Sequence, residues 1–149
     1  MMEPYDLHGS LGYQITLLAR ISERRFERAL TPLGLSRVTW CVLLALEQQG
    51  LHSPSEIASY IGIDRTATSR ALRRLEHSAL VKRQGGQRDR RTTRVTITGK
   101  GRSTLARATD AARENAAHFN EKLSRPEREA LGATIARLMT GETQSVPGL

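Results

Sequence analysis

Two groups of polar and basic residues have the types and spacing to bind a polyanion. The first follows Asp64 on one face of a predicted helix. The second lies in the segment GGQRDRRTTRVTITGKG, residues 85–101, where four arginines fall between Arg88 and Arg94. An arginine presents a planar fork of donors that binds phosphates and guanine edges bidentately. This chemistry is recognition of a nucleic acid.

The net charge of the chain, +8, is concentrated around these residues. Residues 64–102 hold twelve Lys or Arg against three acids, a local balance of +9, so the rest of the chain carries −1. Twenty of the 23 basic residues are arginine. Evenly spread charge would indicate solubility alone, whereas charge gathered in a quarter of the chain indicates a polyanionic partner.

The candidate DNA-binding residues belong to a predicted recognition helix and to a predicted β-hairpin. They are Arg65, Thr66, Ser69, Arg70, Arg73, Arg74, Asp89, Arg90, Arg91 and Arg94. The first four lie on the opening turns of the helix, which meet base edges in the major groove. The next two suit the phosphate backbone, and the hairpin arginines suit a narrow minor groove.

Asp89 needs a separate reason, because an acid close to phosphates weakens binding. It could pair with a neighbouring arginine and fix the direction of Arg91, or it could serve only as a turn residue. If it orients Arg91, Asp89→Ala weakens DNA binding although a repulsive charge is removed.

The elements that must position these residues follow from hydrophobic periodicity and end signals. Ser53, Pro54 and Glu56 form a capping box with proline at the first helical position. Arg20, Glu23, Arg24, Glu27 and Arg28 can pair at i,i+3 or i,i+4. Helices are predicted over Leu11 to about Leu33, Val38 to about Gln49, 54–61, 65–77, Gly99 to about Lys122 and 125–139, with strands at Leu80–Arg83 and Arg94–Thr98.

This order predicts a mainly α fold with a small β-hairpin wing, a winged helix-turn-helix. Residues 1–149 form a single domain, in which about 36–98 make the DNA-binding part. The flanking helices, about 5–35 and 99–141, exceed what that part needs. Long amphipathic helices at both ends commonly bury each other across a two-fold axis, so a homodimer is expected.

Other classes of protein are disfavoured. No nucleophile–base pair, phosphate-cradling glycine loop or paired carboxylates indicate an enzyme, and neither a cofactor nor a metal site is expected. No apolar run approaches the roughly 18 residues of a membrane helix, and no secretory signal is evident. The single cysteine, Cys41, is expected to be an inert thiol, and a single cysteine suits the reducing cytoplasm. A protein-interaction module with an incidental basic face is the alternative that remains open.

The residues from Pro54 to Gly101 resemble the MarR family of bacterial transcription regulators. The wing of that family reads D-P-x-D-R-R-x-x-x-V-x-L-T-x-x-G. The sequence matches this pattern at six positions: Asp89, Arg90, Arg91, Val95, Thr98 and Gly101. It departs at Gly86 and Gln87, where the family has Asp-Pro, and at Ile97, where the family has Leu.

The resemblance implies a homodimer built from the N- and C-terminal helices. Each subunit would offer a recognition helix and a wing to a pseudo-palindromic operator in double-stranded DNA. Members are often repressors that a small aromatic or anionic effector releases. Tyr13, Leu17, Trp40 and Leu44 could line an effector pocket, but leucines and aromatic residues at helical spacing are more commonly core.

Overall fold

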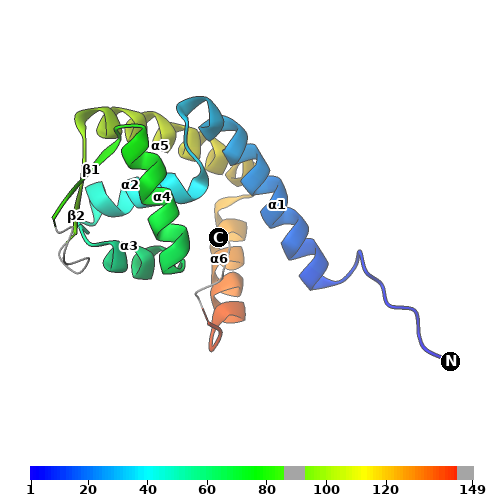
Figure 1. Cartoon of the computed structure of the whole chain (residues 1–149). Coiled ribbons are helices and arrows are strands. Elements are labelled where there is room, and N and C mark those ends of the chain that lie inside the picture. The colour runs from blue at the N-terminus through cyan, green and yellow to red at the C-terminus, as the bar shows by residue number, and fades with distance from the viewer. Residues whose placement is uncertain (86–92, 144–149) are drawn as a thin grey trace.

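The computed structural model of the chain describes residues 1–85 and 93–143. Figure 1 shows a mainly helical fold with one β-hairpin, which confirms the predicted fold class. The elements are α1 (Leu11–Leu30), η1 (Thr31–Leu33), α2 (Arg37–Gln48), α3 (Pro54–Ile61), α4 (Arg65–His77), β1 (Val81–Gln84), β2 (Arg94–Ile97), α5 (Gly99–Asn120) and α6 (Arg125–Met139).

The first predicted helix changes form at its end. The α-helix stops at Leu30, and Thr31–Leu33 make a 3-10 turn that contains Pro32. Proline has no N–H to continue the α-helical pattern. Gly34 then adopts a left-handed conformation with φ 70°, which directs the chain toward α2.

The predicted helix starts are confirmed at their caps. The Ser53 and Ser124 hydroxyls accept hydrogen bonds from the backbone N–H groups of Glu56 and Glu127. In turn, the side chain of each glutamate accepts a hydrogen bond from the backbone N–H of its serine. Hydrogen bonds to the serine lower the pKa of each glutamate. The bond from the serine hydroxyl contributes most, and the bond from the serine backbone N–H contributes less. Ser36 heads α2 through a similar box with Thr39.

The core surrounds α2, which packs against α3, α4, α5 and β2. Val42 and Leu43 of α2, Ile57 of α3 and Leu72 of α4 are fully buried. Full burial of such a side chain contributes about 1.5–3 kcal/mol relative to exposure. This core holds α3 and α4 at a fixed angle.

The hairpin pairs β1 with β2 in antiparallel register, with Val81 opposite Ile97 and Arg83 opposite Val95. The three apolar members of these pairs are buried. The backbone N–H of Val95 also donates to the carbonyl of His52, at 2.8 Å, and so ties the hairpin to the segment before α3.

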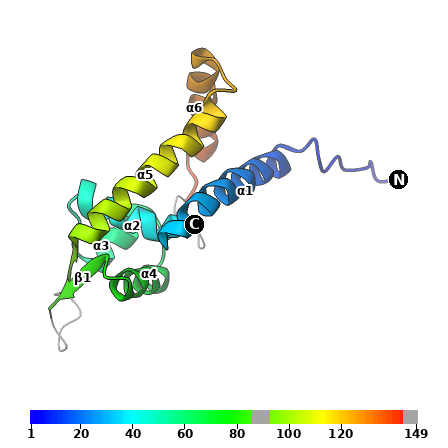
Figure 2. The ribbon, with the colours of Figure 1, turned by 90° about the horizontal axis from the view of Figure 1, so that it is seen from above.

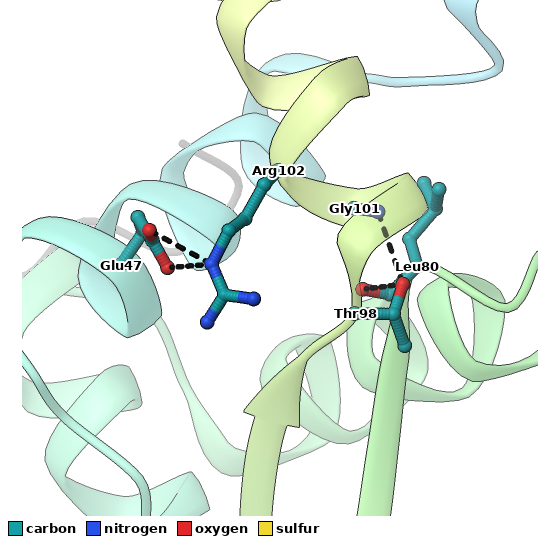
Figure 3. Close-up of polar contacts among 5 residues, drawn as sticks. All are labelled: Glu47, Leu80, Thr98, Gly101 and Arg102. Carbon is teal, nitrogen blue, oxygen red and sulfur yellow. Dashed lines mark hydrogen bonds and ion pairs between the residues drawn. The ribbon is translucent and has the colours of Figure 1, made fainter.

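The hairpin is joined to α5 by a close backbone contact (Figure 3). The Thr98 hydroxyl accepts from Gly101 N–H at 3.0 Å, and the Thr98 N–H donates to the Leu80 carbonyl at 3.0 Å. A Cβ on Gly101 would overlap that same carbonyl, so only glycine allows this approach. Beside it, Arg102 Nε donates to both carboxylate oxygens of Glu47, at 3.0 and 3.1 Å.

The elements from α2 to β2, residues 37–97, form what we call the winged unit. Helices α1 and α5 lie side by side and extend from it, with α6 at the far end of α5 (Figure 2). In α6 no residue is buried. Among the described residues no single helix is long and apolar enough to cross a membrane. Only Leu11–Leu33 and Arg37–Gln48 taken together, across a 72° bend, have such a length and composition.

Candidate nucleic-acid interface

Helix α4 is placed as a recognition helix by its cap and its buried face. The Asp64 carboxylate accepts from Ala67 N–H at 2.7 Å, and Gly62, with φ 80°, makes the turn from α3. Ala71, Leu72 and Leu75 face the core. Residues spaced by four then share the outer face of the helix, so Arg65, Ser69 and Arg73 lie in one row. The helix therefore presents a basic and hydroxyl-rich row to solvent.

A groove of about 770 Å³ runs along this row, between the start of α3, helix α4 and the hairpin. Its lining residues are Ser53, Pro54, Ser55, Arg65, Thr66, Thr68, Ser69, Arg73, Arg83 and Thr93. None of them is acidic. The groove thus offers guanidinium, hydroxyl and backbone donors, which are the groups that bind phosphates and base edges.

The predicted DNA-binding residues divide into three groups. Four of them, Arg65, Thr66, Ser69 and Arg73, come together in the groove. Arg70, Arg74 and Arg94 are exposed but do not line it. Asp89, Arg90 and Arg91 lie outside the described residues, so their predicted roles are untested.

Arg83 lines the groove and was not among the predicted residues. Its Nε lies 3.5 Å from Glu76 Oε2, and its terminal nitrogen donates to the Ser69 carbonyl at 3.4 Å. The buried Nε has no hydrogen bond within the described part of the chain. The available signal was strand alternation, which puts Arg83 on the same hairpin face as Val81. On that face the side chain of Arg83 lies next to buried apolar residues of the hairpin, which is an unusual place for a charged group.

Neither of the two grooves described for this chain is lined by Tyr13, Leu17, Trp40 or Leu44, the residues that could have formed an effector pocket. Trp40 and Leu44 pack against the core, as the core interpretation predicts. Trp40 meets Phe26 edge to face at 5.0 Å, and its indole N–H donates to the Thr109 hydroxyl at 3.4 Å. The core interpretation is wrong for Leu17, which is 45% exposed because α1 extends beyond the winged unit.

Cys41 lies half-buried in α2. Burial raises the pKa of its thiol, and the nearby charge of Arg37 opposes that shift less strongly. A thiol held protonated is a poor nucleophile, which agrees with the prediction of an unreactive cysteine. Within residues 1–85 and 93–143, no three His, Cys, Asp or Glu side chains lie together as metal ligands.

Solved structures of the same fold include complexes with DNA. Residues 33–92 match the MarR family. The chain is 30% identical to the transcriptional repressor CouR bound to a 23-mer DNA duplex, with a TM-score of 0.76 over 93% of this chain and 98% of CouR. For CouR bound to p-coumaroyl-CoA, the identity is 27% and the TM-score 0.78, over 95% and 99% of the two chains.

The fold is also similar to that of a mutant of E. coli MarR complexed with operator DNA. There the identity is 21% and the TM-score 0.76, over 87% of this chain and 93% of that one. Fold and groove together define a winged helix-turn-helix transcription regulator, a class whose members are not enzymes. The chain belongs to the MarR family.

Proposed function

We propose that this protein is a homodimeric repressor that binds a pseudo-palindromic operator in double-stranded DNA and leaves it when a small effector binds. The observation that carries the proposal is the groove where α4, the start of α3 and the hairpin meet, because none of its described lining residues is acidic and two of them, Arg65 and Arg73, are arginines of the recognition helix. Such an operator lies in the cytoplasm of the cell, where the protein would act.

The DNA contacts that we propose are supported by the described positions of the α4 and β1 side chains and by the sequence of the predicted wing. The opening turns of α4, with Arg65, Thr66, Ser69 and Arg70, enter the major groove and read base edges. Arg73, Arg74 and Arg83 bind the flanking phosphates. The wing residues Asp89, Arg90, Arg91 and Arg94 reach the adjacent minor groove, with Asp89 orienting Arg91.

A homodimer is supported by the apolar face of α6, which the single chain leaves uncovered. Leu131, Ile135, Leu138 and Met139 are each 45–49% exposed. Their spacing of three and four residues puts them on one stripe of the helix. Leu11, Ile15 and Leu18 of α1 are exposed in the same way. A second copy would cover both stripes and place two recognition helices on one face.

Release by an effector is supported by CouR, a repressor that forms complexes with DNA and with p-coumaroyl-CoA. By extension, the effector of this chain would be an anionic compound, with or without an aromatic group. Its binding would favour a dimer whose recognition helices no longer match half-sites about one helical turn apart.

Selection from a random DNA library, followed by fluorescence anisotropy, tests the proposal. We expect an inverted repeat with half-sites about one helical turn apart, bound in a salt-dependent way. Arg73→Ala and Arg83→Ala should each weaken binding about tenfold and lower the salt slope by about one. Arg107→Ala, an exposed arginine of α5 outside the groove, is the matched control. Binding without sequence preference, or unchanged by both groove variants, would refute the proposal.

A further inference from the structure

A second groove, of about 590 Å³, lies between α1 and α5, away from the DNA-binding groove. We call it the arginine groove, because three guanidinium groups line its α1 side. The lining residues that matter here are Arg24, Arg25, Arg28, Asn115, His118 and Phe119. Helix α5 leads from the winged unit to α6, and α1 lies beside α5 (Figure 2).

The arginines of this groove lack the acidic partners that the sequence predicts for them. Glu23 and Glu27 were expected to pair along α1, but both bind Arg37 at the start of α2. Arg37 Nη1 lies 2.8 Å from Glu23 Oε1, and Arg37 N–H donates to Glu27 Oε1 at 2.8 Å.

Among the described residues, none of the three groove arginines forms an ion pair, and the only acid lining the groove is Glu114. Three like charges within two turns of one helix repel one another. An anion placed among them would remove that repulsion. Because three arginines line one groove, they suit a group with several oxygens and more than one negative charge, which describes a phosphate.

The α5 side of the groove supplies one unsatisfied acceptor and an apolar surface. Asn115 Oδ1 is buried and has no hydrogen-bond donor within the described residues. A ligand hydroxyl or amide N–H would satisfy it. The Phe119 ring meets His118 edge to face at 5.0 Å, and Lys122 Nζ lies 5.8 Å from the ring centre. Ala111 and Phe119 are the apolar residues that line this side of the groove, and they could contact the uncharged part of an organic molecule.

We propose that the arginine groove is the effector site and that its ligand is an organic phosphate. The phosphate lies among Arg24, Arg25 and Arg28, and a hydroxyl or amide of the same molecule donates to Asn115 Oδ1. This proposal rests on effector release as the proposed function. A ligand bound to α1 and α5 together fixes the angle between them, and through that angle the spacing of the two recognition helices.

Isothermal titration calorimetry of the full-length protein tests the ligand class, with coenzyme A, p-coumaroyl-CoA and p-coumarate as probes. The two coenzyme A compounds should bind at least tenfold more tightly than p-coumarate, which lacks a phosphate. The double variant Arg25→Ala/Arg28→Ala should lose at least tenfold in affinity for them. Arg20→Ala, an exposed arginine of α1 outside the groove, should stay within twofold of the wild type. Asn115→Asp, which puts a negative charge at the buried oxygen, should also cost at least tenfold.

Three results would overturn the inference: no binding of either coenzyme A compound, equal binding of p-coumarate, or a double variant that dissociates the dimer while its ligand affinity is unchanged. DNA affinity without ligand, measured by anisotropy, should be the same in the double variant and the wild type. A protein that binds its operator but neither coenzyme A compound refutes this inference alone. One that binds coenzyme A but no DNA refutes the repressor function.

Discussion

The winged unit differs from the start of α1 and from α6 in whether a single copy of the chain buries its apolar residues. The buried apolar core runs from Phe26 to Ala108 and encloses α2 on several sides. The large hydrophobic residues exposed in the described parts of the chain, apart from Tyr60, all lie in the first 21 residues or in α6. The winged unit buries most of its apolar residues within one chain, whereas the start of α1 and α6 leave most of theirs exposed. Stability and assembly can therefore be tested in separate parts of the molecule.

The largest effect should come from charging the apolar stripe of α6. The double variant Leu131→Asp/Ile135→Asp would place two carboxylates where a second copy is expected to pack, so the dimer should dissociate. DNA affinity should fall by more than about 100-fold, because two half-sites would no longer be bound by one linked pair. Analytical ultracentrifugation and anisotropy measure the two effects.

Ala133→Asp adds the same charge on the opposite side of α6 and serves as the control. Circular dichroism should show that both variants keep their helices, since α6 contributes no buried residue to the core. A double variant that remains a dimer and binds DNA normally would show that α6 is not part of the assembly.

The sequence predicted the winged unit more fully than its functional surface. Caps such as Asp64 and Thr98 are local signals, and the backbone groups they bind lie within three residues, so the helix starts were confirmed. The position of Arg83 depends on the register of two strands, in which Arg83 pairs with Val95, twelve positions further along the chain. Glu23 and Glu27 were misassigned for a similar reason. Their partner, Arg37, approaches only after the chain turns at Gly34.

A smaller but still large effect is expected at the contact between the hairpin and α5. In Gly101→Ala the added methyl group would overlap the Leu80 carbonyl and crowd Ile97. Since the nearest obstacle is backbone, the strands or α5 must shift, at a cost of about 1–3 kcal/mol typical of overpacking. Urea denaturation measures that loss, and displacement of the wing should weaken DNA binding as well.

Gly99→Ala is the matched control two residues earlier in α5, where a Cβ would meet nothing within 4 Å. There alanine should leave stability unchanged or raise it by up to about 1 kcal/mol, because it lowers the entropy lost on forming a helix. Equal effects of the two substitutions would mean that the close approach at Gly101 does not hold the hairpin.

The smallest effect is expected for the ion pair beside that contact, although its geometry is good (Figure 3). The side chains of Arg102 and Glu47 are 57% and 35% exposed, so water screens their attraction. A double-mutant cycle of Arg102→Ala and Glu47→Ala should give a coupling energy below about 1 kcal/mol, which 1 M salt removes. A coupling above about 2 kcal/mol that persists in salt would contradict this. The ion pair would then share with Gly101 the attachment of α5 to the winged unit, and that attachment would be insensitive to ionic strength.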